Sequence, residues 1–266
     1  MPELTGRTAL VLGASRGLGR AIALTLAREG AAVVVTYRSR VAAAQGVVKR
    51  IEAMGGAAIA CAVDAGDAAD VERLWRSVGD RFGTIDIVVV SVGGDWKPQE
   101  IVAIEPDHWQ RVLRLEQDAV FYCLRAALPS MRAQGWGRVV LIGGHAVELW
   151  PMEPPVAPLD YPLGKAARHW IARNLGEREL RHGITVNAVA PSWLDVPDDA
   201  TIDARVIGKG LDQDRREGPG PQDVAEVVAF LCTERARFVS GSVIDVTPPH
   251  FPDETLGRLG GGADAG

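Results

Sequence analysis

The sequence predicts a single-domain α/β protein built on a doubly wound parallel sheet of about seven strands flanked by helices. Short apolar runs alternate with longer segments of helical spacing along most of the chain. A glycine-rich turn at residues 13–19 joins the first apolar run to the first helix. With 266 residues, 47% of them hydrophobic, the chain can bury one full α/β core.

Each expected strand is a short apolar run bounded by polar residues or glycine. These runs are Thr8–Leu12, Ala32–Thr36, Ala57–Val63, Ile85–Val90, Arg138–Ile142, Ile184–Ala188 and Ser242–Val246. Each expected helix has apolar residues at helical spacing, and several end at a glycine. These segments are Arg20–Glu29, Val41–Met54, Ala68–Phe82, Asp107–Arg132, Tyr161–Leu180 and Gln222–Cys232. The fourth strand is so apolar that we expect it in the middle of the sheet, covered on both faces.

The composition excludes several classes of protein. The net charge is −5 and no long basic run occurs, so neither nucleic acid nor an anionic membrane is an expected partner. No apolar stretch has transmembrane length, and the start MPELTGRTALV lacks the regions of a signal peptide. Cys61, Cys123 and Cys232 fit no zinc or disulfide spacing. We therefore expect no metal, reduced thiols and a cytoplasmic location.

No second core or linker divides the chain, so residues 1–256 are predicted to form one domain. Residues 257–266 are rich in glycine and are predicted to be a disordered tail.

The turn Gly13-Ala14-Ser15-Arg16-Gly17-Leu18-Gly19 is a candidate pyrophosphate site. Backbone N–H groups at a helix N-terminus point at an anion, and glycines let the chain approach it closely. The alternative is a tight strand-to-helix turn that binds nothing.

The spacing of these glycines resembles the G-x-x-x-G-x-G motif of the short-chain dehydrogenase/reductase family. The resemblance extends from Gly13 to Asp245 and implies a Rossmann-type fold that binds a nicotinamide dinucleotide. The other segments that match the family are Asp64 after the third strand, Tyr161-Pro162-Leu163-Gly164-Lys165, Val186–Pro191, Asp223-Val224-Ala225 and Gly241–Asp245. By this resemblance, Asp64 would lie against the adenine, and the segment ending at Pro191 would line the nicotinamide site. The resemblance also places a mobile substrate lid near residues 197–221.

Tyr161 and Lys165 share one helix face, because they are four residues apart. An adjacent ammonium lowers the pKa of a phenol and lets it exchange a proton with a carbonyl or alcohol oxygen. By the resemblance, Lys165 would also hold the nicotinamide ribose. The alternative is a surface Tyr–Lys pair without a role in catalysis.

The end of the second strand indicates NADP(H). It reads Thr36-Tyr37-Arg38-Ser39-Arg40, where NAD-binding members of such folds usually place an acid. A guanidinium suits a 2′-phosphate, although Arg38 and Arg40 are alternatively solvated charges. The expected cofactor-binding residues are Gly13, Ser15, Arg16, Gly17, Leu18, Gly19, Arg38, Ser39, Asp64, Ala65, Ser91, Gly93, Tyr161, Lys165, Pro191, Ser192 and Leu194.

Several family positions around the expected reaction centre carry other residues. Gly144 stands where the family has a serine that binds the reacting oxygen, and Glu116 stands where it has an asparagine that holds a relay water. His145 is a candidate substitute donor, since imidazole titrates near neutral pH, or else an ordinary loop histidine. If Glu116 pairs with Lys165, it partly cancels the field that acidifies Tyr161; if it holds the water, the relay survives. Two further alternatives are a substrate that carries its own activation, as a quinone, iminium or conjugated ketone does, and a site that no longer performs hydride transfer.

Trp96, Trp150 and Trp193 follow predicted strand ends, where doubly wound sheets bind ligands. Together with Gly144 they are the expected substrate pocket, and they favour a bulky, flat, aromatic or polycyclic substrate over three unrelated packing roles. Trp150 belongs to a proline-stiffened loop before Tyr161 that is longer than the family's usual spacing. The family also pairs its long helix and its Tyr161 helix across dimers and tetramers, so a homo-oligomer is expected.

The sequence thus predicts an NADPH-dependent oxidoreductase of ketoreductase type, with Tyr161 as acid/base, Lys165 as its partner, and Glu116 and His145 beside them. Two alternatives remain. One is an enzyme of the same fold with non-redox activity, such as a dehydratase, cyclase or isomerase. The other is a catalytically silent NADPH-binding protein.

Overall fold

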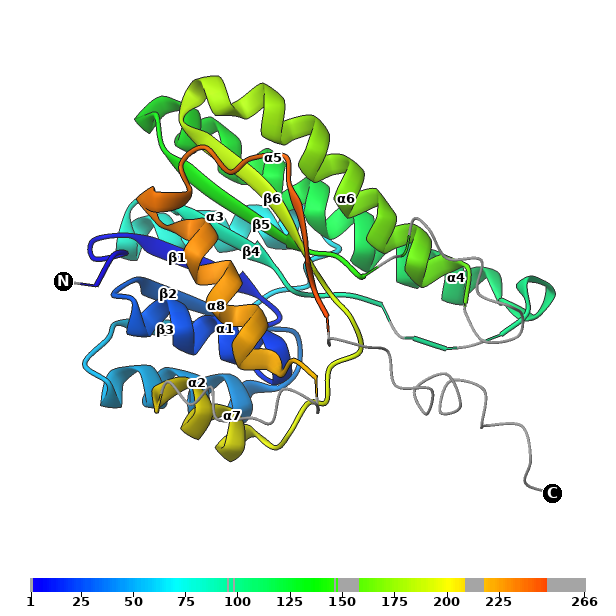
Figure 1. Ribbon diagram of the computed structural model, residues 1–266, viewed down its shortest axis with the longest axis horizontal. Coiled ribbons are helices and arrows are strands. Elements are labelled where there is room, and N and C mark those ends of the chain that lie inside the picture. Colours follow the sequence, from blue (N-terminus) through cyan, green and yellow to red (C-terminus); the bar gives the residue numbers. More distant parts are fainter. Residues whose placement is uncertain are drawn as a thin grey trace.

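The computed structural model describes residues 2–94, 96–97, 99–145, 147, 158–208 and 218–247. Its centre is a seven-stranded parallel sheet with the order β3-β2-β1-β4-β5-β6-β7 (Figure 1). The strands are β1 (Thr8–Leu12), β2 (Ala32–Tyr37), β3 (Ala58–Ala62), β4 (Ile87–Val90), β5 (Gly137–Ile142), β6 (Ile184–Pro191) and β7 (Val243–Val246). The helices are α1 (Gly17–Arg28), α2 (Val41–Ala53), α3 (Ala68–Phe82), α4 (Pro106–Leu113), α5 (Ala119–Gln134), α6 (Asp160–Glu179), α7 (Asp199–Ile207) and α8 (Pro221–Cys232).

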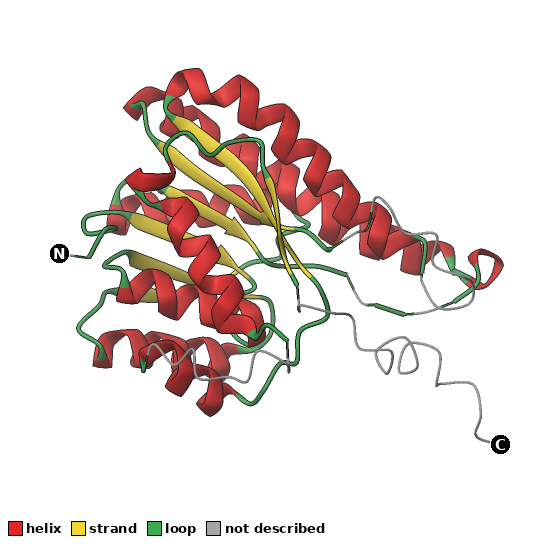
Figure 2. Cartoon of the chain, viewed as in Figure 1, coloured by secondary structure: helices red, strands yellow, loops and turns green. Residues whose placement is uncertain are grey.

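Helices cover both faces of the sheet (Figure 2). One core cluster joins α1, α2, α7 and α8 to the sheet, and a second joins α3, α5 and α6 to the opposite face. All four residues of β4 are buried, which confirms the expectation that this strand lies mid-sheet. An all-parallel sheet needs such cover, because both its faces are apolar.

The predicted doubly wound sheet is confirmed, and most element bounds agree within one to three residues. Two differences bear on function. The single long helix expected over Asp107–Arg132 is two α-helices joined by a π-helical turn at Arg114–Asp118. The region of the expected lid contains a helix, α7, which is not among the helices expected from the sequence. Residues 209–217 of the expected lid and the tail from residue 257 lie outside the described part of the chain.

α7 is held against the helix that follows the glycine turn. The Arg20 guanidinium on α1 donates to both carboxylate oxygens of Asp203 at 2.7 and 2.8 Å, and both side chains are buried. Arg50 on α2 donates to the same carboxylate at 3.2 Å. Ion pairing and the packing of Ile202 therefore fix this segment on the sheet face that carries α1.

The parallel register brings the carboxyl ends of β1, β4, β5 and β6 to one edge of the sheet. In such sheets this edge is where ligands bind. No helix in the described ranges is long and apolar enough to cross a membrane.

Candidate functional site

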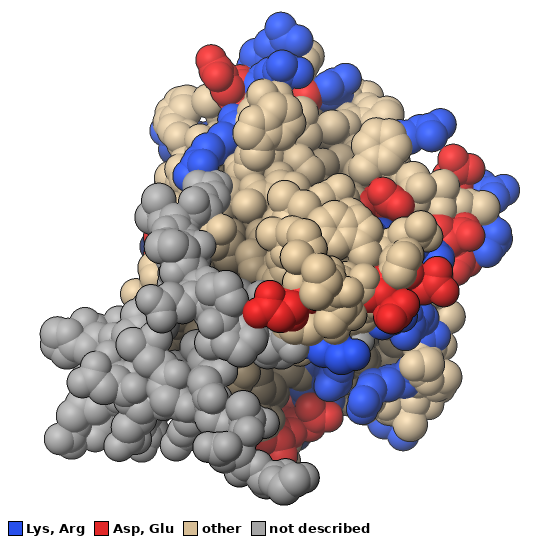
Figure 3. All heavy atoms as spheres, turned by 90° about the vertical axis from the view of Figure 1, so that its right-hand side faces the viewer, with Lys and Arg blue, Asp and Glu red and all other residues tan. Residues whose placement is uncertain are grey.

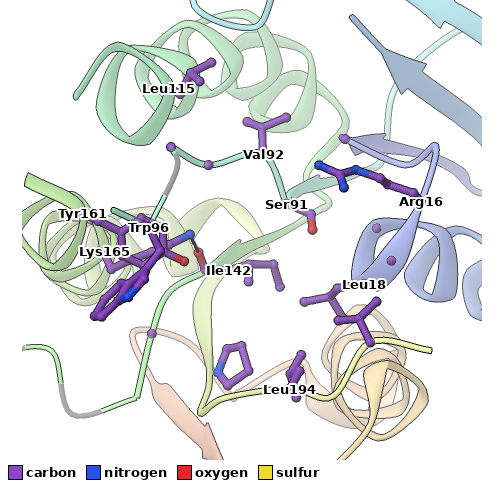
Figure 4. Close-up of a pocket in the computed structure, with 18 of the residues that line it drawn as sticks. Arg16, Leu18, Ser91, Val92, Trp96, Leu115, Ile142, Tyr161, Lys165 and Leu194 are labelled. Carbon is purple, nitrogen blue, oxygen red and sulfur yellow. Dashed lines mark hydrogen bonds between the residues drawn. The ribbon is translucent and has the colours of Figure 1, made fainter. Parts of the chain in front are cut away.

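A cavity of about 930 Å³ opens at the carboxyl edge of the sheet. Figure 4 shows its two ends: Arg16 and Leu18 project from the glycine turn and the start of α1, while Tyr161, Lys165 and Trp96 lie together on the opposite side. The expected site residues that line it are Gly13, Ser15, Arg16, Gly17, Leu18, Gly19, Arg38, Asp64, Ala65, Ser91, Gly93, Trp96, Gly144, His145, Tyr161, Lys165, Pro191, Ser192, Trp193 and Leu194. Glu116 lies buried behind the wall, Ser39 is not among the lining residues, and Trp150 lies outside the described residues.

The glycine turn has a shape that side chains would prevent. Gly13 and Gly17 adopt positive φ angles of 76° and 53°. A Cβ atom on Gly19 would lie 2.1 Å from the carbonyl oxygen of Gly13. The hydroxyl of Thr36 braces the turn by accepting from Gly13 N at 3.1 Å and donating to the Val11 carbonyl at 3.0 Å. The N-terminus of α1 therefore opens onto the cavity, an arrangement that suits an anion.

The end of β2 brings Arg38 to the cavity wall without an acidic neighbour on that strand end. Asp64 follows β3 and lines the same side. Its carboxylate accepts from Arg114 Nη2 at 2.8 Å, and Gly66 N donates to it at 3.0 Å. Two cavity-lining guanidiniums, Arg16 and Arg38, thus lie at the end of the cavity that carries the glycine turn.

Tyr161 and Lys165 lie on one face of α6, as their spacing predicts. Lys165 Nζ lies 5.1 Å from the centre of the Tyr161 ring and donates to the Ile142 carbonyl at 3.3 Å. Trp96 packs edge-on against the Tyr161 ring, with a distance of 5.4 Å between ring centres. The tyrosine is thereby held between an ammonium and an aromatic wall of the cavity.

Glu116 pairs with Lys165, which settles one alternative left open by the sequence. Its Oε2 lies 3.3 Å from Lys165 Nζ and 2.9 Å from Arg168 Nη2, and its Oε1 accepts from Gly94 N at 2.8 Å. The side chains of Glu116 and Arg168 are fully buried, and that of Lys165 is 5% exposed. A carboxylate between two cations therefore lies directly behind the reaction centre.

Arg168 also links the π-helical turn to the ends of β4 and β5. Its guanidinium donates to the carbonyl oxygens of Glu116 at 3.0 Å, Ile142 at 2.8 Å, Val92 at 2.8 Å and Leu115 at 3.1 Å. A buried guanidinium needs most of its five donors paired, and these carbonyls supply that pairing. Arg168 is thus a positioning residue that the sequence reading missed. Its spacing of three residues from Lys165 is the signal that indicates a shared helix face.

Glycines make room for this buried network. A Cβ atom on Gly164 would lie 2.4 Å from Glu116 Cβ, and one on Gly93 would lie 2.6 Å from Glu116 Oε1. Directly after β5, a Cβ atom on Gly143 would lie 2.2 Å from Nε2 of His169 on α6. The larger side chains of Glu116 and His169 therefore depend on the absence of side chains opposite them.

The buried charges shift the two central pKa values in a direction the sequence did not predict for Tyr161. Burial, and then Glu116, raise the pKa of Tyr161 to about 12, with Arg168 opposing. Burial, and then Arg168, lower the pKa of Lys165 to about 8, with Glu116 opposing. A lone ammonium would have lowered the phenol pKa, but desolvation and the carboxylate outweigh it here. The phenol therefore carries its proton at neutral pH.

Gly144 and His145 occupy the end of β5, where Gly144 offers no hydroxyl. Gly144 N donates to His169 Nε2 at 3.4 Å, and His145 N donates to the Pro191 carbonyl at 3.0 Å. The His145 ring lies on the cavity wall with Nδ1 2.8 Å from Asp245 Oδ1 on β7. His145 is therefore oriented by an acid of the last strand.

Of the expected tryptophans, Trp96 and Trp193 reach the cavity. Trp193 follows β6 and is 65% exposed. Apolar side chains of Val112, Leu115 and Val147 complete the wall near Tyr161. The wall near Tyr161 thus combines Trp96 with apolar side chains.

Comparisons with known proteins agree with this geometry. The family model described as enoyl-(acyl carrier protein) reductase matches residues 13–247. A 3-oxoacyl-(acyl-carrier-protein) reductase from Synechocystis is 33% identical over 247 residues, covering 92% of this chain and 97% of that protein. A hydroxynaphthalene reductase-like protein from Metarhizium robertsii is 36% identical over 260 residues, covering 92% and 95%. The crystal structure of a dehydrogenase/reductase from Sinorhizobium meliloti superposes with a TM-score of 0.77 at 33% identity, covering 92% and 94%.

Proposed function

Because the chain belongs to the short-chain dehydrogenase/reductase family of oxidoreductases, we propose that it is an NADPH-dependent ketoreductase acting on a bulky, flat, aromatic or polycyclic carbonyl compound. The observation that carries the proposal is the Tyr161–Lys165 pair, which faces the glycine turn across one cavity. The names of two relatives, a 3-oxoacyl-(acyl-carrier-protein) reductase and a hydroxynaphthalene reductase-like protein, support carbonyl reduction.

The residues present fit a dinucleotide phosphate. The turn that Gly13 and Gly19 keep free of side chains would hold the pyrophosphate at the N-terminus of α1. Arg16 and Arg38 would hold a 2′-phosphate through charge-assisted hydrogen bonds. When bound, NADPH supplies the hydride that reduces the carbonyl carbon. Asp64 on the same side would contact the adenine.

Tyr161 supplies the proton in this proposal. Its hydroxyl donates to the carbonyl oxygen as that oxygen gains negative charge, and the alcohol is formed. A phenol with a pKa of about 12 stays protonated at neutral pH, so the site favours reduction over alcohol oxidation. Lys165, close behind the phenol, stabilises the tyrosinate that remains and passes a proton back to it. Glu116 replaces an asparagine-held water as the group that supports Lys165.

The absence of a side-chain hydroxyl at Gly144 limits the carbonyl compounds that the site can reduce. One donor at a developing oxyanion is typically worth about 10²- to 10³-fold in rate. We therefore infer that the substrate is an activated carbonyl, such as a quinone or a conjugated ketone, unless His145 donates in place of the serine. A His145→Ala variant separates these cases, since it leaves turnover unchanged only in the first.

The decisive experiment measures NADPH oxidation with a panel of bulky ketones and quinones, beside calorimetric titrations with NADPH and NADH. Turnover that falls by about 10²- to 10⁴-fold in Tyr161→Phe supports the proposal. Tight NADPH binding without turnover of any carbonyl would instead favour a non-redox enzyme of this fold or a silent NADPH-binding protein.

We also propose that the protein works in the cytoplasm as a homo-oligomer. On the outer face of the α5 and α6 layer, Phe121 is 58% exposed and Trp170 is 64% exposed. Exposed large aromatic residues on neighbouring helices are typical of protein interfaces. Light scattering on the purified chain should give a dimer or tetramer.

A further inference from the structure

A second chain of polar contacts connects the cavity wall to the backbone of Tyr161. Arg111 on α4 lines the cavity, and its Nη2 donates to His108 Nδ1 at 2.8 Å. His108 Nε2 lies 3.2 Å from Oδ2 of Asp160, whose side chain is fully buried. The other oxygen of Asp160 accepts from Tyr161 N at 2.8 Å. The proposed mechanism uses none of the first three residues.

The donor pattern along this chain fixes the role of each group. Arginine only donates, so His108 Nδ1 accepts from Arg111 Nη2. On its other side the His108 ring approaches the Asp160 carboxylate through Nε2. The contact with one ring nitrogen leaves other N–H groups of the five-donor guanidinium at the cavity wall. Within the described residues, no carboxylate lies at ion-pair distance from Arg111.

Arg111 differs from its surroundings in the cavity. Its wall neighbours near Tyr161 are Trp96, Val112 and Leu115, which are apolar or aromatic. Among the described lining residues, the carboxylates are Asp64 after β3 and Asp199 on α7, neither at this end. Figure 3 shows the face of the molecule at the α4 end: a broad area of uncharged residues has acidic groups within it and beside it, and residues of both charges lie toward its right-hand side. Lys165 is a second cation that lines this end, but its ammonium is paired with Glu116 at 3.3 Å, so Arg111 carries a guanidinium at this end that has no carboxylate partner among the described residues.

We propose that Arg111 is the substrate-binding residue that selects an anionic substrate, one whose carbonyl group lies at Tyr161 and whose carboxylate binds the guanidinium. This inference rests on the proposed reductase function and names its substrate class as keto acids with a flat apolar body. His108 and Asp160 hold Arg111 in place and couple its position to the start of α6. A carboxylate suits the planar guanidinium, because two parallel N–H groups can bind its two oxygens.

The test compares keto acids with their uncharged esters. The probes are acetylbenzoate and methyl acetylbenzoate, with acetoacetate and methyl acetoacetate as a smaller pair. Binding is measured by calorimetry in the presence of NADP⁺, so that no reduction occurs, and KM is measured separately with NADPH. The variants are Arg111→Gln, Arg111→Lys and, as a matched control, Lys97→Gln. Lys97 is an exposed cation beside Trp96 that is not among the cavity-lining residues.

Wild-type protein should bind the acid more tightly than the ester. Arg111→Gln should weaken acid binding by about 10- to 100-fold and should change ester binding by less than about threefold. Arg111→Lys should retain part of the preference, and Lys97→Gln should retain all of it. Equal binding of acid and ester, or equal loss of both in Arg111→Gln, would overturn the inference and leave Arg111 a structural brace. Absence of turnover with preserved acid-selective binding would overturn only the proposed reductase function.

Discussion

Replacing Lys165 by methionine should stabilise the protein while removing its activity. Lys165 is one of two cations that share the buried carboxylate of Glu116. After the substitution, Glu116 keeps its ion pair with Arg168 at 2.9 Å, and the Ile142 carbonyl keeps its hydrogen bond from Arg168 at 2.8 Å. No buried polar atom loses its last partner, and methionine fills a similar volume. Replacing buried charges by apolar groups is often neutral or stabilising.

The magnitude follows from the pKa of Lys165, which falls from 10.5 to about 8 because the ammonium is buried beside Arg168. One pKa unit corresponds to about 1.4 kcal/mol, so the charged form costs about 3 kcal/mol at neutral pH. A gain of this order would raise the melting temperature by about 6–12 °C in a chain of this size.

The sign of the pH dependence provides the sharper test. Between about pH 8 and the ordinary lysine value, the unfolded chain holds the lysine proton and the folded chain does not. The unfolding free energy of the wild type should therefore rise with pH across this window relative to Lys165→Met, and the two should differ most below pH 8. Tyr161, with a pKa raised to about 12, adds an opposite slope only above about pH 10.

The assay is urea denaturation followed by circular dichroism at about pH 7 and about pH 9.5. Lys49→Met, at an exposed lysine on α2, is the matched control and should show neither the stabilisation nor the pH effect. A Lys165→Met variant that is less stable than the wild type at neutral pH, or whose difference from it does not shrink with rising pH, would refute the reasoning.

Three further substitutions test the site. Arg168→Leu should lower the unfolding free energy by about 3–5 kcal/mol, measured by urea denaturation. Glu116 then keeps only Lys165 as a cationic partner, and the buried carbonyls lose the hydrogen bonds from the guanidinium. A loss below about 1 kcal/mol would contradict this expectation. Gly19→Ala should abolish NADPH binding in calorimetry while the far-ultraviolet spectrum stays folded, because the new Cβ would lie 2.1 Å from the Gly13 carbonyl oxygen; unchanged affinity would argue against the turn as the pyrophosphate site. Asp203→Asn should release α7 from α1 and speed proteolysis of that segment, and an unchanged cleavage pattern would show that apolar packing alone holds it.

The arrangement of the strands was predictable from the sequence, because local patterns determine it. Alternating apolar runs and helical segments allow few right-handed topologies, and the observed strand order is one of them. The glycine turn and the pair Tyr161 and Lys165 were found for the same reason. Glycine spacing and helical periodicity are short-range features, visible without knowing what packs against them.

The environment of that pair was decided by the tertiary structure. The sequence left open whether Glu116 pairs with Lys165 or holds a water, and it did not indicate Arg168 as a partner, because these contacts join residues about fifty positions apart in the chain. The direction of the Tyr161 pKa depended on how much water these contacts exclude, and no spacing rule reports burial. The chain of contacts from Arg111 to the start of α6 was likewise invisible, since a surface-like arginine becomes a cavity residue only when α4 packs beside α6. Sequence thus determined which groups are present and the scaffold that carries them, and packing in three dimensions determined their charges and partners.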